Sequence, residues 1–175
     1  MDEATRVKLP DAEQLCEQLA RELAPRIGPR SAMIGIHTGG AWVAERLHAE
    51  LGLPEPLGLM DIAFYRDDYH QQGLHHDPKR TRIPFDVTGR QLLLVDDVLY
   101  TGRTIRAAMN ELFDYGRPES ITLVVLADRG GRQLPICAQH CGARIEVPPG
   151  MRLRLTRGAQ GKLAHELAAK LLSLR

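Results

Sequence analysis

Two apolar runs separated by one amphipathic segment constrain this chain more than any other feature of its sequence. Residues 91–95 read QLLLV and residues 120–127 read SITLVVLA, and such runs are typical of strands buried on both faces of a parallel sheet. Residues 103–115, which lie between them, place apolar side chains at helical spacing, and Gly116 and Pro118 predict the end of that helix. The three segments together predict a strand, a crossover helix and a second strand parallel to the first.

The same alternation continues on both sides of this unit. Towards the N-terminus the patterns predict a helix, a short buried strand, a second helix and another strand, over residues 11–24, 32–37, 40–51 and 57–65. Towards the C-terminus they predict a short strand over residues 151–156 and an amphipathic helix over residues 161–174. We therefore expect an α/β fold, a parallel twisted sheet flanked by helices, with residues 1–175 forming one domain.

Composition excludes some classes of function. The 175 residues carry a formal net charge of +1, so no overall field marks the chain as a nucleic-acid or membrane binder. No run approaches the roughly 20 apolar residues that span a bilayer, and the N-terminus lacks the apolar core of a signal peptide. The cysteines, Cys16, Cys137 and Cys141, follow no disulfide framework and indicate reduced thiols, so we expect a cytoplasmic protein with no membrane contact.

Two clusters contain metal-ligating residue types. Residues 137–141 read CAQHC, but a structural zinc site needs four ligands and no second pair stands nearby, so packing or surface thiols are favoured. Residues 66–84 have no clear period and read as a long loop, and they hold His70, His75 and His76. Solvated side chains are favoured there, because a loop lacks the surrounding groups that orient metal ligands.

Ligands of parallel α/β sheets bind beyond the carboxyl ends of the strands, and three turns occupy such places, at residues 37–40, 96–104 and 128–131. The central turn leads into a helix whose first N–H groups have no internal partner and can bind a phosphate. Gly102 lets the backbone come close to that phosphate, and Thr101 and Thr104 add hydroxyl donors.

Asp96 and Asp97 stand side by side just before this turn. Carboxylates repel phosphate, so they are expected to face vicinal sugar hydroxyls instead, and the predicted ligand is a ribose 5-phosphate. The alternative is purely structural: Asp97 caps a loop and Thr104 caps the helix.

These residues also resemble a known family. VDDVLYTGRT at residues 95–104 resembles the phosphoribosyl-pyrophosphate (PRPP) motif of type I phosphoribosyltransferases. DIAFYRDD at 61–68, DYGRP at 114–118 and LADRGGRQLPI at 126–136 resemble the PyrR family, whose members are pyrimidine operon attenuators and uracil phosphoribosyltransferases. The similarity covers roughly residues 10 to 157.

The resemblance implies a role for each part of the site. Asp96 and Asp97 hold the ribose hydroxyls, and with Arg66 they are the expected catalytic residues. The pyrophosphate loop contains a peptide that is sometimes cis, and Mg²⁺ is held mainly by PRPP itself. Residues 66–84 form a mobile lid, and Arg129 with the segment to about residue 149 forms a small hood over uracil. The expected PRPP-binding residues are Thr38, Gly39, Gly40, Asp96, Asp97, Val98, Leu99, Tyr100, Thr101, Gly102, Arg103 and Thr104.

The pyrophosphate loop departs from the family pattern of threonine, arginine, glycine, because it reads Thr38, Gly39, Gly40. Loss of a preorganised cation costs about 3 kcal/mol, or roughly a hundredfold in rate. Either the activity is weak, in which case Gly39→Arg raises turnover, or the change is a lineage variant without consequence. Cations near the lid would also compensate: Arg66, Lys79, Arg80 or Arg82.

The expected function is the conversion of uracil and PRPP to UMP and diphosphate, and regulation of pyrimidine genes in response to uridine nucleotides, by a homo-oligomer. Binding of pyr leader RNA needs a basic face, for which Arg144, Arg152 and Arg154 are the candidates, although such strips are more often solvated surface. The alternative is a non-catalytic nucleotide sensor that binds this RNA. A third option is another base, a purine or orotate, with Arg132 or Arg144 supplying a cation for orotate.

Overall fold

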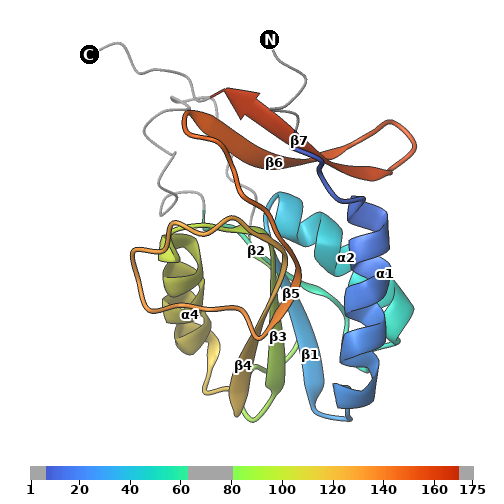
Figure 1. Cartoon of the computed structure of the whole chain (residues 1–175). Helices are drawn as coiled ribbons and strands as arrows, with labels where there is room; N and C mark the ends of the chain where they lie inside the picture. The colour runs from blue at the N-terminus through green and yellow to red at the C-terminus, as the bar shows by residue number, and fades with distance from the viewer. Residues whose placement is uncertain (1–6, 63–80, 170–175) are drawn as a thin grey trace.

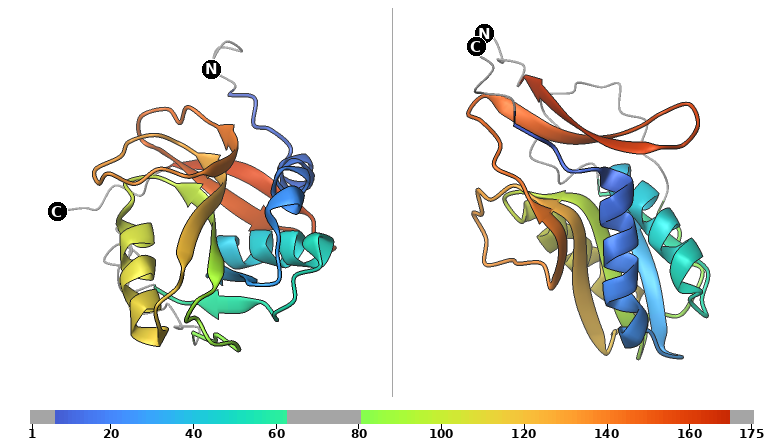
Figure 2. Two further views of the ribbon diagram at one scale, coloured as in Figure 1. Left: turned by 90° about the horizontal axis from the view of Figure 1, so that it is seen from below. Right: turned by 45° about the vertical axis from the view of Figure 1, so that its right-hand side comes forward.

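The computed structural model describes residues 7–62 and 81–169, and its centre is a five-stranded parallel sheet. Helices α1 (Ala12–Leu23) and α2 (Gly39–Leu51) cover one face and α4 (Arg103–Tyr115) covers the other, as Figure 1 shows. An antiparallel hairpin lies across the carboxyl edge (Figures 1 and 2). The sheet order is β2 (Gly58–Met60), β1 (Ser31–Ile36), β3 (Gln91–Leu99), β4 (Ser120–Asp128) and β5 (His140–Arg144), and the hairpin strands are β6 (Met151–Arg157) and β7 (Leu163–Ala169).

The three helices form where the sequence pattern predicts them. Helix α1 begins at an N-cap, Asp11, whose carboxylate accepts N–H bonds from Glu13 and Gln14 at 2.9 and 3.1 Å. Its apolar stripe, which includes Leu19 and Leu23, is buried against the sheet. A 3₁₀ turn at Ala24–Arg26 leads from α1 to β1.

Strand β3 is the middle strand, and both of its faces are buried. It pairs with β1 on one side and with β4 on the other. Leu93 and Val95 pack in the cluster beneath α1 and α2, whereas Leu92 and Leu94 pack in the cluster beneath α4. Burial on both faces therefore explains the near-continuous apolar run at residues 91–95, as expected of a central parallel strand.

The predicted C-terminal helix is wrong: Leu163–Ala169 form strand β7. Its side chains alternate, with Leu163 buried and Ala164 exposed, and it pairs with β6 in a register that sets Leu153 opposite Leu167. The leucine and alanine content of this segment favours a helix locally, but cross-strand pairing and burial of one face favour a strand.

The expected hood boundaries also need correction. His140–Arg144, which were expected to belong to the hood, pair instead with β4 as the fifth strand of the core sheet. Strand β5 was not predicted, since HCGAR lacks the usual β-branched or aromatic residues. Gly142 permits the pairing, as a Cβ there would lie 2.6 Å from the Leu126 carbonyl oxygen. The β6–β7 hairpin instead lies over the carboxyl edge of the sheet.

The hairpin is attached to the rest of the molecule by its inner face. Leu155 and Leu163 belong to the same buried cluster as the apolar stripe of α1. Glu13 accepts a hydrogen bond from the Leu163 N–H at 2.7 Å. Arg157 forms an ion pair with Glu45 at 3.0 Å.

Part of the expected lid, with Arg66, the three loop histidines, Lys79 and Arg80, lies outside the described residues. So does the end of the strand predicted over 57–65. Residues 81–84 are described, and Arg82 exchanges two backbone hydrogen bonds with Leu59, at 2.8 and 2.7 Å. No helix in the part of the chain that the structure describes is long and apolar enough to cross a membrane.

Leu155→Ala tests whether the hairpin shares the core of the sheet and helices. Leu155 is 7% exposed, so its truncation is expected to lower the free energy of unfolding by about 2–4 kcal/mol in chemical denaturation. Arg154→Ala, at the neighbouring exposed position, is the matched control and is expected to change stability by less than about 0.5 kcal/mol. Equal, small effects of both substitutions would contradict a shared core.

Candidate active site

The carboxyl edge of the sheet brings together the three turns that the sequence singled out. Residues 37–40 follow β1, residues 96–104 include the end of β3, and residues 128–131 begin at the last residue of β4. Helix α2 begins at Gly39 and helix α4 at Arg103, so two helix N-termini lie at this edge. Each N-terminus carries the positive end of a helix dipole, which favours anions.

Asp96 and Asp97 lie inside β3, which extends to Leu99, rather than beyond the end of a strand over 91–95. Asp96 is 2% exposed, and its Oδ1 accepts the backbone N–H of Asp97 at 2.9 Å. Asp97 is half-buried, and its carboxylate lies against the backbone of Gly39. The second carboxylate therefore faces the pyrophosphate loop, and the first supports the strand backbone beside it.

The turn before α4 has the geometry expected of a phosphate site. Gly102 is the N-cap with φ of 93°, a left-handed conformation that favours glycine, and it has no side chain to accept an N–H bond. The Thr101 hydroxyl accepts the Arg103 N–H at 3.2 Å. Thr104 lies within the first turn, so the alternative reading of Thr104 as a helix cap is wrong.

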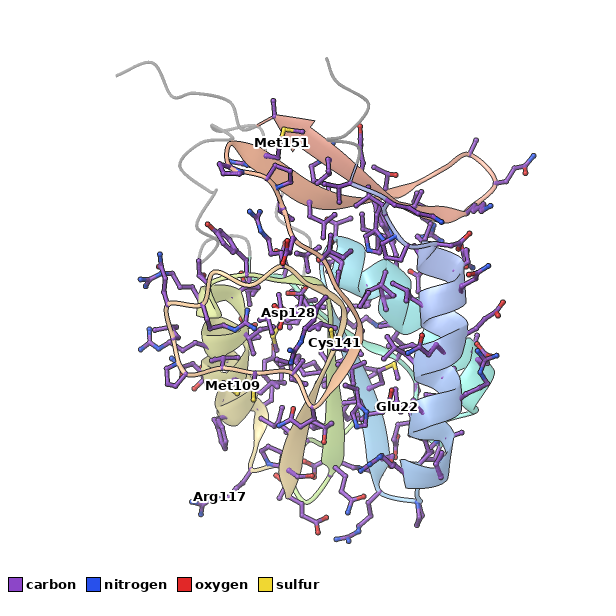
Figure 3. All side chains as sticks on the ribbon, in the orientation of Figure 1. Glu22, Met109, Arg117, Asp128, Cys141 and Met151 are labelled. Atoms are coloured by element: carbon purple, nitrogen blue, oxygen red, sulfur yellow. The ribbon has the colours of Figure 1, made fainter. Side chains whose placement is uncertain are left out.

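Arg103 and Arg129 contact other parts of the site. Arg103 donates through Nε to the Gln133 side chain at 3.1 Å. The Arg129 guanidinium lies over the Tyr100 ring, 4.1 Å from its centroid, and donates to the Met151 carbonyl at 3.4 Å. Arg129 Nε is buried and has no hydrogen-bond partner within the described structure. Arg129 thus links the phosphate turn to the hairpin, whose first residue, Met151, is labelled in Figure 3.

The pyrophosphate loop has a cis peptide bond between His37 and Thr38, as the family resemblance implied. A Cβ at Gly39 would collide with the carboxylate and Cβ of Asp97, and a Cβ at Gly40 would lie 2.7 Å from the Val95 carbonyl oxygen. The backbone of this loop therefore lies directly on β3. Any side chain at position 39 would require Asp97 to move, and the effect of Gly39→Arg on turnover stays a prediction.

The three candidate RNA-binding residues occupy two different elements. Arg144 ends β5, and Arg152 and Arg154 lie on the outer face of β6, opposite the buried Leu153 and Leu155. Arg144 therefore lies on a different strand from Arg152 and Arg154, and a loop separates the two strands. The three arginines do not form a strip along one element.

Comparison with known proteins agrees with this geometry. Residues 7–144 match the phosphoribosyl transferase domain family. The "Bifunctional protein PyrR" of Nitrosococcus oceani is 53% identical over 129 residues, which cover 73% of each chain. The protein of that name from Pseudomonas aeruginosa is 48% identical over 153 residues, covering 85% of this chain and 90% of its own. This chain belongs to the PyrR family.

Solved structures outside the PyrR family have the same fold. A hypoxanthine phosphoribosyltransferase from Staphylococcus aureus superposes with a TM-score of 0.63 at 22% identity, covering 81% of this chain and 78% of that one. The Trypanosoma cruzi enzyme, a variant in a ternary substrates complex, gives a TM-score of 0.61 at 20% identity, covering 79% and 80%. At such identities the likeness concerns the fold alone.

In this PyrR-family site, Asp128 received no role of its own in the sequence analysis, and Arg132 was considered only as a cation for orotate. Asp128 and Arg132 form an ion pair at 2.6 Å beside the phosphate turn. Burial of the Asp128 carboxyl would raise its pKa, but hydrogen bonds from Arg132 and from the Gly130 N–H bring the pKa below its ordinary value. The sequence feature that could have predicted this ion pair is DRGGR at residues 128–132, where an acid and a base stand four residues apart around two glycines.

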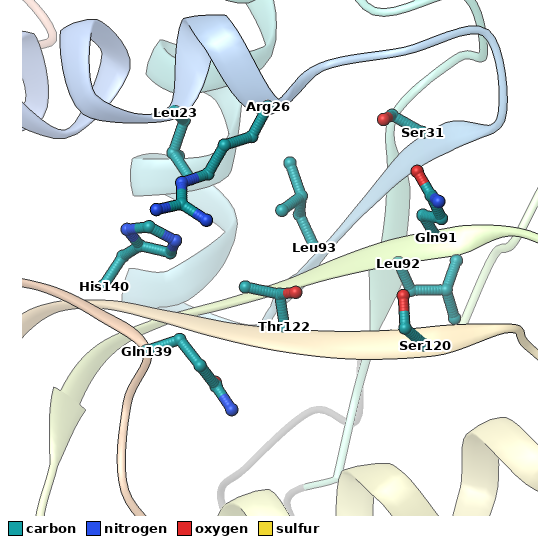
Figure 4. Close-up of a pocket in the computed structure, with 10 residues that line it drawn as sticks. All are labelled: Leu23, Arg26, Ser31, Gln91, Leu92, Leu93, Ser120, Thr122, Gln139 and His140. Carbon is teal, nitrogen blue, oxygen red and sulfur yellow. The ribbon is translucent and has the colours of Figure 1, made fainter.

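A separate hollow of about 220 Å³ lies at the opposite, amino edge of the sheet, beneath the end of α1 (Figure 4). Beside it, His140 Nδ1 donates to Glu22 at 2.5 Å, so the His140 of CAQHC pairs with a carboxylate. Among the described residues no group of three or more His, Cys, Asp or Glu could hold a metal. The residues lining the hollow are Leu23, Arg26, Ser31, Gln91, Leu92, Leu93, Ser120, Thr122, Gln139 and His140.

Gly39→Ala tests the contact between the pyrophosphate loop and Asp97. The added methyl group is expected to overpack the site, lowering the free energy of unfolding by about 1–3 kcal/mol and weakening PRPP binding. Gly28→Ala is the matched control, because nothing lies within 4 Å of a Cβ at that position. A Gly39→Ala protein as stable as the control, with unchanged PRPP affinity, would contradict the assigned contact.

Proposed function

We propose that the protein transfers the phosphoribosyl group of PRPP to uracil, which gives UMP and diphosphate. The observation that carries this proposal is the pair of adjacent carboxylates between two helix N-termini at one sheet edge. Within the described residues, the N-cap residues of α2 and α4 accept no N–H bond through a side chain. The Thr101 hydroxyl accepts the Arg103 N–H, and the other first N–H groups of the two helices can serve anions. PRPP presents the complementary pattern: a phosphate at one end, a diphosphate at the other and two hydroxyls between them.

Each part of the site then has a role in the reaction. The bond from ribose C1 to diphosphate breaks as the bond to uracil N1 forms, through an oxocarbenium-like sugar. The N-terminus of α4 and residues 101–104 hold the 5-phosphate, and Asp96 and Asp97 hold the ribose. The N-terminus of α2, with Thr38, receives the leaving diphosphate, where fixed N–H dipoles stabilise developing negative charge. The N1 proton leaves to solvent or through Asp97.

The residues present fit a magnesium ion that is held mainly by the ligand. Mg²⁺ keeps several waters and is usually bound through one or two carboxylates together with substrate phosphates. Asp96 and Asp97 could supply those one or two oxygens, and the described chain offers no larger acidic cluster. When bound, the ion would neutralise charge on the diphosphate.

Arg129 supports uracil as the base. Its buried Nε–H has no hydrogen-bond partner in the described structure, and an unsatisfied buried donor is costly unless a ligand completes it. A uracil carbonyl oxygen is a suitable acceptor. Orotate would need a further cation, but Arg132 is already paired with Asp128 at 2.6 Å, which disfavours that alternative.

We propose a second activity in gene regulation, in which the same pocket senses uridine nucleotides and the protein binds pyr leader RNA. The outer face of β6 supports this proposal, because Arg152 and Arg154 project from it on the side away from the core. Arg144 could contribute from the end of β5. A non-catalytic sensor is the alternative. We further propose a homo-oligomer in the cytoplasm, where the free cysteines would remain reduced.

The deciding experiment is UMP formation from labelled uracil and PRPP with Mg²⁺, with hypoxanthine and orotate tested in parallel. Uracil is expected to be the base that reacts. If no base reacts but UMP still binds, the enzyme proposal is wrong and the sensor is favoured. RNA binding is measured on the same preparation as a function of salt, and wild-type affinity that falls steeply with salt supports regulation.

Asp96→Asn combined with Asp97→Asn tests the ribose contacts. Loss of both charges is expected to abolish the rise in thermal unfolding temperature that PRPP with Mg²⁺ produces in the wild-type protein. Asp97→Asn alone is a second variant, since the buried Asp96 also supports the fold. Asp114→Asn, an exposed position on α4, is the control. Protection that is unchanged in both site variants would remove the ribose assignment.

A further inference from the structure

Three successive carbonyl groups of the phosphate turn, those of Leu99, Tyr100 and Thr101, are all held by one neighbouring segment. That segment, residues 128–136, is called the brace. Backbone N–H groups of the brace donate to the Leu99 oxygen at 3.1 Å and to the Thr101 oxygen at 3.0 and 3.2 Å. The Tyr100 oxygen between them accepts from a side chain of the brace, Arg132, through Nη1 at 2.7 Å.

Arg132 is itself fixed by a carboxylate. Its Nη2 donates to Asp128 Oδ2 at 2.6 Å, and Asp128 Oδ1 accepts the Gly130 N–H at 2.9 Å. The two side chains are 24% and 14% exposed, so water screens this pair only partly. One guanidinium therefore joins a carboxylate of β4 to a backbone carbonyl of the phosphate turn.

The brace also packs on the side chain of the turn. Gly131, with φ of 76°, brings its backbone so close to the Tyr100 ring that a Cβ there would collide with it. The Arg129 guanidinium lies over the same ring. Tyr100 is thus held through both its carbonyl and its ring.

Fixing these carbonyls has a consequence for the ligand side of the turn. The peptide bonds of the turn are trans, and in a trans peptide the C=O and N–H groups point in opposite directions. When the carbonyls of Tyr100 and Thr101 point to the brace, the N–H groups of Thr101 and Gly102 point away from it. Carbonyl oxygens, which would repel a phosphate, are thereby removed from the ligand side.

We infer that Arg132 is a positioning residue for the phosphorylated ligand: held by Asp128, it orients the Tyr100–Thr101 peptide so that the turn presents N–H groups to the 5-phosphate. The inference rests on the proposed function. Arg132 acts through the backbone of the turn, and it contributes by preorganisation, which lowers the cost of ordering the turn when ligand binds.

Arg132→Gln tests the inference by comparing two ligands that differ only in the phosphate, UMP and uridine, by calorimetry. UMP affinity is expected to fall at least about tenfold, the size of one lost charge-assisted hydrogen bond, while uridine affinity stays unchanged. In steady-state assays the KM for PRPP is expected to rise and the KM for uracil to remain constant. Arg117→Gln, an exposed arginine near the amino edge (Figure 3), is the matched control.

Two further variants distinguish positioning from general stability. Arg132→Lys can satisfy only one of the two acceptors, so an intermediate loss of UMP affinity is expected. Asp128→Asn is expected to weaken UMP binding as Arg132→Gln does. The double variant is expected to bind UMP as tightly as the single variant with the lower affinity, because the pair acts as one unit.

Unchanged UMP affinity in Arg132→Gln and in Arg132→Lys would overturn the inference while leaving the proposed function intact. Equal losses for UMP and uridine would also overturn it, since they would indicate a general effect on the fold. Fully additive losses in the double variant would overturn the role of Asp128. A wild-type protein that binds neither UMP nor PRPP would overturn the proposed function, and the inference with it.

Discussion

Parallel hydrogen bonding of β3 to β1 and to β4 is the constraint on which the other features of this molecule depend. Because the three strands run in one direction, the turns that follow them emerge at the same edge of the sheet. Burial of β3 on both faces holds that edge rigidly, since α1 and α2 pack on one side and α4 on the other. Asp96, Asp97 and the N-terminus of α4 are close in the sequence, and the parallel sheet brings the distant N-terminus of α2 to them.

The proposed ligand carries anionic groups close to the carboxylates of Asp96 and Asp97. N–H groups and carboxylates of the site therefore face different parts of that ligand. In the proposed complex, the N–H groups that start α2 and α4 serve the two anionic ends of PRPP, and Asp97 lies between them against Gly39. The brace directs the carbonyls of the phosphate turn away from the ligand. Position 39 holds glycine where the family pattern has arginine, and the absence of a side chain there leaves the space that the Asp97 carboxylate occupies.

The hairpin gives the two faces of one element different roles. Leu153 packs against Val98 and Ala127 at the ends of β3 and β4, so the inner face covers the carboxyl edge. The outer face carries Arg152 and Arg154, the residues proposed to contact RNA. The Arg129–Met151 hydrogen bond joins the start of this hairpin to the ligand site.

The sequence alone determined the α/β class, three helices, the central strands and the turn at residues 96–104, because each depends on local periodicity or on adjacent residues. Tertiary structure decided the rest. Strand β7 is a strand only because β6 pairs with it, and β5 only because β4 does. The contacts of Gly39 with Asp97 and of Arg132 with Tyr100 join residues 58 and 32 positions apart, and local patterns carry no information about such separations.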